Sequence, residues 1–127
     1  MAIVELDSSC FEATVSREGV LVVECWASWC GGCEMFEPTF EAVSRRHPDV
    51  RFAKLDTGSH PELTETVGVT QVPTLLVFRD GLLLLRHPGG VDETALEGIV
   101  AQAVALDMNV VRADMENEAR KADRAVT

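Results

Sequence analysis

Two cysteines, Cys30 and Cys33, stand three positions apart in the stretch ECWASWCGGCEMFEP, which runs from Glu24 to Pro38. On a strand, residues three apart lie ~10 Å from each other on opposite faces, far beyond the ~5.5 Å between α-carbons that a disulfide prefers. In the first turn of a helix they are neighbours. The spacing therefore favours a redox-active dithiol, with half of a metal site or two idle thiols as the alternatives.

The position of Cys30 predicts which thiol reacts first. Gly31 and Gly32 are expected to let the chain turn sharply off a preceding strand, which leaves Cys30 at a helix N-terminus. Unpaired backbone N–H groups at such a terminus favour a thiolate, so we expect Cys30 to be the nucleophile. Cys33, one turn deeper, is expected to stay protonated until it attacks the mixed disulfide and releases the reduced substrate.

The other two cysteines do not complete a metal site. A closed zinc site needs four ligands, usually as two knuckles, and neither Cys10 nor Cys25 has that local pattern, so no metal is expected. Cys25 lies in an apolar run and is expected to be inert, whereas Cys10 begins a short helix and a regulatory role for it stays open. The three histidines each precede a proline and are expected to be solvated: His47, His60 and His87.

Length and charge narrow the classes of protein. A chain of 127 residues with 46% apolar content fits one domain. Its net charge of −10 disfavours nucleic acid as a partner, because phosphate binding relies on clustered Lys and Arg. No window approaches the ~20 apolar residues of a membrane span, and the N-terminus lacks a signal-peptide pattern. We therefore expect a soluble, cytoplasmic protein with no membrane partner. Four cysteines in a cytosolic chain of this size argue against a disulfide framework and favour catalytic or metal-binding thiols among them.

The hydrophobic pattern predicts alternating strands and helices. A continuous apolar run, Gly19–Trp26, indicates a central strand covered on both faces, and a helix with apolar residues at helical spacing follows from Cys33. Residues 50–56 alternate as a second strand, and HPELTETVGV indicates a short helix closed by Gly68. After Pro73, two strands joined through Asp80-Gly81 indicate a hairpin. A last helix starts near Asp92, its N-cap, with these residues facing inward: Leu96, Ile99, Val100, Ala103 and Val104.

Over roughly Ile3 to Ala105, the sequence resembles the thioredoxin family. The resemblance rests on WASWCGGC, Pro38 in the following helix, AKLD, VPTLLVFRDG and Gly89, all in the order and at the spacings of a thioredoxin. It implies an α/β fold with a central mixed sheet flanked by helices, and a dithiol that reduces protein disulfides without a cofactor. The implied partners are disulfide-containing client proteins and a reductase of the thioredoxin-reductase type. The alternative is a binding or adaptor module in which the dithiol is incidental.

One departure from the family concerns Gly32, where thioredoxins usually carry proline. Without proline the loop is more flexible, so closing the disulfide costs more conformational entropy. The restored backbone N–H can also donate to a thiolate, which favours the reduced form. Both effects predict a more oxidising couple.

Two charged residues in the predicted sheet match family positions. Glu24 interrupts an apolar strand where thioredoxins bury an Asp, so its pKa should be raised and it should exchange a proton with Cys33 through water. The alternative is that the longer Glu side chain reaches solvent. Lys54 matches a thioredoxin lysine near that acid, and a solvated lysine at a strand end is the alternative.

The resemblance also implies a substrate-binding surface. Sequence alone predicts a trans bond before Pro73, whereas thioredoxins hold this proline cis against the disulfide. Val72 would then offer its backbone to an extended substrate peptide, and Trp29 would lie over the site as an apolar docking surface, with Trp26 in the core. The glycines of this surface are Gly31, Gly32 and Gly89.

The chain continues past the family match. We expect residues 1–106 to form the thioredoxin domain and residues 107–127 to form a C-terminal extension, helical or disordered. Five residues fit one helical stripe, which would let the last helix run on past the domain: Val104, Met108, Val111, Met115 and Ala122. A disordered tail is the alternative, because charges of both signs and poor order are common at chain termini.

Overall fold

A five-stranded mixed sheet forms the centre of the computed structural model, which describes residues 3–126. The strand order is β1-β3-β2-β4-β5, where β1 and β2 run parallel to β3, and β4 runs antiparallel to β2 and β5. The strands are β1 (Val4–Glu5), β2 (Val20–Trp26), β3 (Arg51–Asp56), β4 (Thr74–Arg79) and β5 (Leu82–Pro88). This arrangement confirms the predicted mixed sheet.

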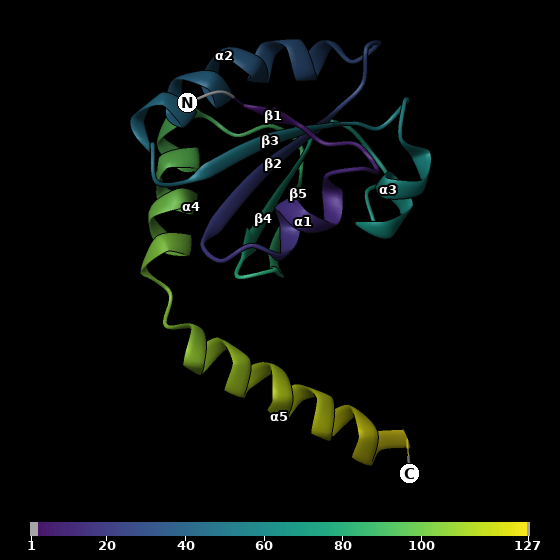
Figure 1. Cartoon of the computed structure of the whole chain (residues 1–127), viewed down its shortest axis with the longest axis vertical. Coiled ribbons are helices and arrows are strands. Elements are labelled where there is room, and N and C mark those ends of the chain that lie inside the picture. The colour runs from purple at the N-terminus through teal and green to yellow at the C-terminus, as the bar shows by residue number, and fades with distance from the viewer. Residues whose placement is uncertain (1–2, 127) are drawn as a thin grey trace.

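Helices cover both faces of the sheet (Figure 1). They are α1 (Phe11–Ser16), α2 (Gly31–Arg46), α3 (Pro61–Thr66), α4 (Glu93–Ala105) and α5 (Met108–Val126). Buried side chains of α2 and α4 pack on one face, whereas residues of α1 and α3 pack on the other. The short helix before Gly68 is confirmed, because α3 ends at Thr66 and Gly68 follows with φ +71°.

Side chains of the central strand β2 point alternately to the two faces of the sheet. Val20 and Val22 join the core under α2 and α4, and Leu21 and Val23 join the core under α1 and α3. Both cores are apolar, which explains why β2 is a continuous apolar run rather than an alternating one. The same alternation puts Glu24 on the α2 face and its neighbour in the chain on the opposite face.

The hairpin between β4 and β5 turns as predicted. Asp80 and Gly81 have φ of 52° and 84°, the left-handed values that a two-residue hairpin turn of this kind requires. Asp80 also accepts a hydrogen bond from the backbone N–H of Gly19 at 2.7 Å, which ties the turn to the start of β2.

Residues 108–126 form a separate helix, so of the two alternatives for this segment the one in which α4 runs on is wrong. The chain bends by 87° between α4 and α5. Asp107 lies at this bend, where its carboxylate accepts from the N–H of Asn109 at 3.0 Å and caps the second helix. The result is an α5 that extends away from the domain (Figure 1).

The prediction that Val104 of α4 faces inward is also wrong. Leu96, Val100 and Ala103 are buried as predicted, but Val104 is 45% exposed, because the helix ends one residue later and the chain turns away. Asp92 caps the start of α4 as predicted, accepting from the N–H of Ala95 at 2.7 Å.

The first two turns of α5 contact the domain. Met108 is 7% exposed, and Arg112 forms an ion pair with Asp80 at 3.4 Å, whereas Met115 is 45% exposed. Among the described residues no single helix is long and apolar enough to cross a membrane, although α4 and α5 taken together as a bent pair meet that length and composition test.

Candidate active site

The dithiol sits where β2 leads into α2. Cys30 is the N-cap of α2, as predicted, and forms a disulfide with Cys33, with their α-carbons 5.2 Å apart. The backbone N–H of Cys33 donates to the Cys30 sulfur at 3.0 Å. An N–H of the first helical turn, which has no partner within the helix, is therefore directed at this sulfur.

The turn off β2 is not made by the two glycines, which corrects the expectation for Gly31 and Gly32. Neither has a positive φ. The chain turns through residues 27–30, where the N–H of Cys30 donates to the carbonyl of Ala27 at 3.2 Å. Gly32 lies beside the loop before β4, where an added Cβ would be in ordinary van der Waals contact with Cδ of Pro73 at 3.4 Å.

The two sulfur-bearing residues differ in access to solvent. Cys33 is only 3% exposed, whereas Cys30 is partly exposed. Trp29, just before the dithiol, is 73% exposed and lies against Gly58, where an added Cβ would meet its ring at 3.0 Å. Cys30 is therefore the more accessible of the two, and it follows an exposed aromatic residue.

The loop before β4 adopts the conformation that the family resemblance implied. The Val72–Pro73 bond is cis, and the carbonyl of Pro73 accepts from the N–H of Gly89 at 2.7 Å. A groove runs from Trp29 along this loop, lined by Thr57, Thr64, Val69, Thr70, Gln71 and Val72. The predicted surface residues Trp29, Val72, Pro73 and Gly32 thus lie together. Gly89, which directly follows β5, donates its N–H to the Pro73 carbonyl.

Glu24 is fully buried in the sheet. Its side chain is 0% exposed, so the alternative that it reaches solvent is wrong. Within the described residues, neither carboxylate oxygen accepts a hydrogen bond from a protein group. Desolvation raises the pKa of Glu24 from its ordinary 4.5 to about 7, although the charge of Lys54 pulls this pKa down.

Lys54 is buried beside this carboxyl. It pairs with Glu24 in the β2–β3 register and is 8% exposed, so the solvated alternative is wrong. Its ammonium lies 2.5 Å from a carboxylate oxygen of Glu37 and 4.8 Å from the centre of the Trp26 ring. Desolvation lowers the pKa of Lys54, but the hydrogen bond to Glu37 and the nearby carboxylates outweigh it and leave that pKa raised.

Glu37 is not among the site residues predicted from the sequence. It lies in the helix expected to follow from Cys33. The ion pair shows that Glu37 lies on the side of α2 that faces Lys54 of β3. The available signal was its place one turn after Cys33, in a helix that follows a strand and precedes one carrying a lysine.

The remaining cysteines and histidines lie apart from this chemistry. Cys25 is 0% exposed, and desolvation raises its pKa to about 12, as expected for an inert thiol. Cys10 is a free thiol at the N-cap of α1, the helix start that the sequence predicted. His47 is not simply solvated, because its Nε2 lies 2.6 Å from a carboxylate oxygen of Glu97. In the described part of the chain, no group of three or more candidate ligands is placed to hold a metal ion.

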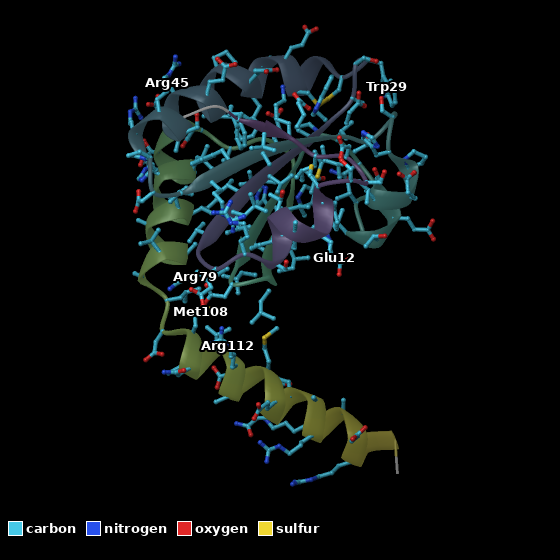
Figure 2. The ribbon with its side chains drawn as sticks, viewed as in Figure 1. Glu12, Trp29, Arg45, Arg79, Met108 and Arg112 are labelled. Carbon is cyan, nitrogen blue, oxygen red and sulfur yellow. A yellow bond between two sulfur atoms is a disulfide. The ribbon has the colours of Figure 1, made fainter. Side chains whose placement is uncertain are left out.

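The dithiol and the C-terminal helix lie at opposite ends of the domain. Figure 2 shows Trp29, which directly precedes Cys30, on one side, and Met108 and Arg112 of α5 on the other. The surface around the disulfide is accordingly built by β2, α2 and the loop before β4.

Comparisons with known proteins agree with this geometry. Residues 2–102 match the family model described as Thioredoxin. A Streptomyces coelicolor protein described as thioredoxin 2 is 38% identical over 109 residues, covering 86% of this chain and 81% of the relative. The thioredoxin of Bacillus subtilis is 36% identical over 101 residues, covering 79% and 96%.

A solved structure shows the same fold. Oxidised mitochondrial thioredoxin 3 from Saccharomyces cerevisiae superposes with a TM-score of 0.72 at 32% identity, covering 79% of this chain and 94% of that one. With the disulfide at the start of α2 and a cis proline close to it, the chain belongs to the thioredoxin family and is a thiol-disulfide oxidoreductase of the disulfide-reductase type.

Proposed function

We propose that Cys30 attacks the substrate and Cys33 resolves the intermediate. The Cys30 thiolate attacks one sulfur of a substrate disulfide, forms a mixed disulfide and expels the first substrate thiolate. The Cys33 thiolate then attacks the Cys30 sulfur, which releases the second substrate thiolate and closes the Cys30–Cys33 disulfide. The unequal exposure of the two cysteines carries this assignment.

Glu24 serves as the proton acceptor and donor for Cys33. Its burial raises the pKa to about 7, so near neutral pH the carboxyl exists in both protonation states. Both oxygens lack a protein partner among the described residues, which leaves them available for proton exchange. Lys54 supplies the positive charge beside this carboxyl and favours its ionised form.

The substrate peptide binds in extended form along the loop before β4. Val72 offers its backbone to the peptide, and Trp29 offers an exposed ring beside the groove. Gly31, Gly32, Pro73 and Gly89 shape the surface around the dithiol, and the position of Gly32 beside Pro73 supports this arrangement.

The partners are disulfide-containing client proteins and an electron donor of the thioredoxin-reductase type, acting in the cytoplasm. The family supports the partner classes. The net charge of −10 supports a protein that binds neither nucleic acid nor a membrane surface. The glycine at position 32 supports a couple more oxidising than that of a proline-containing thioredoxin.

Residues 1–106 form the domain that carries this activity, and residues 107–127 form an extension outside it. The bend before α5 and the exposure of most of that helix support this division.

Trapping experiments test the two cysteine roles. We expect Cys33→Ser to accumulate a mixed disulfide with a model substrate, because only the second step is lost, and Cys30→Ser to accumulate none. Mass spectrometry of the quenched reaction measures both, and insulin reduction with dithiothreitol measures turnover. Equal trapping by the two variants would refute the assignment, and wild type that fails to accelerate insulin reduction would favour the adaptor alternative.

A further inference from the structure

Among the described residues, Lys54 hydrogen-bonds the Glu37 carboxylate but not the nearby Glu24 carboxylate. Its ammonium lies 2.5 Å from the Glu37 carboxylate, whose side chain is 40% exposed. The second carboxylate, Glu24, is adjacent in the β2–β3 register, is fully buried and has no hydrogen-bond partner among the described residues. The partner that Lys54 takes is therefore the more exposed acid.

The choice of partner matters because the pKa of a buried carboxyl depends strongly on nearby charges. A cation that moves toward a buried acid favours its ionised form, and a cation held elsewhere leaves it protonated to higher pH. Glu37 holds the Lys54 ammonium on the α2 side, where the Trp26 ring also contacts it at 4.8 Å.

We propose that Glu37 is a positioning residue that holds Lys54 away from Glu24 and thereby sets the pH at which Glu24 exchanges its proton. The inference rests on the proposed role of Glu24 in proton exchange. It adds a residue of α2 that acts through Lys54 and does not itself touch the reacting sulfurs.

The charges around Glu24 come from three elements. Lys54 on β3 lowers the pKa of Glu24, whereas Glu37 and Glu41 on α2 and Glu5 on β1 raise it, and desolvation raises it most. Removing the Glu37 charge should therefore lower the pKa of Glu24 in two ways. It removes a repulsive charge, and it frees Lys54 to approach Glu24.

The test measures the pKa of Glu24 from the NMR shift of its carboxyl carbon between about pH 4 and about pH 9. We expect Glu37→Gln to lower this pKa by on the order of 1 pH unit. Glu41→Gln is the matched control, because Glu41 is an acid on the same helix that also repels Glu24 but has no contact with Lys54 among those described. We expect its effect to be less than half as large.

A double variant isolates the route through Lys54. In a Lys54→Met background, Glu37→Gln should lower the pKa of Glu24 by less than it does with Lys54 present, because only the direct repulsion of Glu37 is then lost and no cation remains to be released. Equal shifts from the two single variants, or an undiminished shift in the Lys54→Met background, would overturn the inference.

The proposed role of Glu24 is tested separately by the rate of the resolving step. If Glu37→Gln lowers the pKa of Glu24 and the pH profile of resolution moves with it, both proposals stand. If the pKa moves and the profile does not, the positioning role of Glu37 stands and the catalytic role of Glu24 fails.

Discussion

Two adjacent ionisable residues of β2 are buried on opposite faces of the sheet, and only one of them titrates near neutral pH. Glu24 and Cys25 are both 0% exposed, and burial raises both pKa values, to about 7 and about 12. On the α2 face, Lys54 offsets part of the desolvation of Glu24. On the other face, Cys25 lies among apolar side chains, and the charge of Glu24 raises its pKa further.

Burial raises both pKa values, but from different ordinary values, 4.5 for the Glu24 carboxyl and 9.0 for the Cys25 thiol. The acid therefore titrates near neutral pH, whereas the thiol stays protonated there. The face with the titrating acid is also the face covered by α2, whose first turn carries the dithiol. The side chains that β2 buries on the opposite face pack as an apolar core.

The largest expected contrast is in thiol reactivity. In the reduced protein, iodoacetamide should label Cys30 well below pH 8.5, the ordinary thiol value, because the α2 N-terminus stabilises its thiolate. Cys25 should stay unlabelled in the folded state, since its pKa is about 12 and it is fully buried. Peptide mass spectrometry measures both, and labelling of Cys25 at a similar rate would break the comparison.

A cavity on the apolar face should cost stability without affecting redox chemistry. Leu76 is 1% exposed and packs in the core under α1 and α3. We expect Leu76→Ala to lower the free energy of unfolding by about 2–5 kcal/mol, by the same amount at about pH 5 as at about pH 8 within about 1 kcal/mol. Urea denaturation at both pH values measures this, and a strongly pH-dependent loss would contradict it.

Replacing the buried Glu24 should raise the free energy of unfolding, by an amount that depends on pH. The unfolded chain loses the Glu24 proton near 4.5 and the folded protein near 7, so wild type loses stability as pH rises between these values. Glu24→Gln does not titrate. Its gain should therefore be small below about pH 4.5, grow toward about pH 7 and level off above it, at about 3 kcal/mol or less. Urea denaturation across this range measures the gain, and a gain that does not vary with pH would contradict the raised pKa.

The smallest effect is expected far from the dithiol, at the start of α5. Arg112 pairs with Asp80 at 3.4 Å and its side chain is 49% exposed. Arg112→Ala should lower the free energy of unfolding by under about 1 kcal/mol and leave insulin reduction unchanged. A loss of turnover in this variant would show that α5 takes part in the activity.

Local patterns predicted most of the fold. The apolar run of β2, the Asp80-Gly81 turn and the Asp92 cap each depend on short-range preferences that the sequence displays directly. The break before α5 was missed although Asp107 is a good N-cap, because the apolar stripe continued across it.

The dithiol was predictable from its spacing, but the partner of Lys54 was not. Three acids, Glu5, Glu24 and Glu37, influence Lys54, and only the packing of α2 on β3 determines which of them it binds. The cis bond before Pro73 likewise followed from the family resemblance and not from local preference.

The role of Glu24 is tested most directly by single-turnover reduction of a model disulfide by wild type and Glu24→Gln, from about pH 6 to about pH 10. We expect the variant to resolve the mixed disulfide more slowly near neutral pH, where Cys33 needs a proton acceptor. The difference should disappear at alkaline pH, where solvent suffices. Superimposable profiles would contradict this role and remove Glu24 from the mechanism.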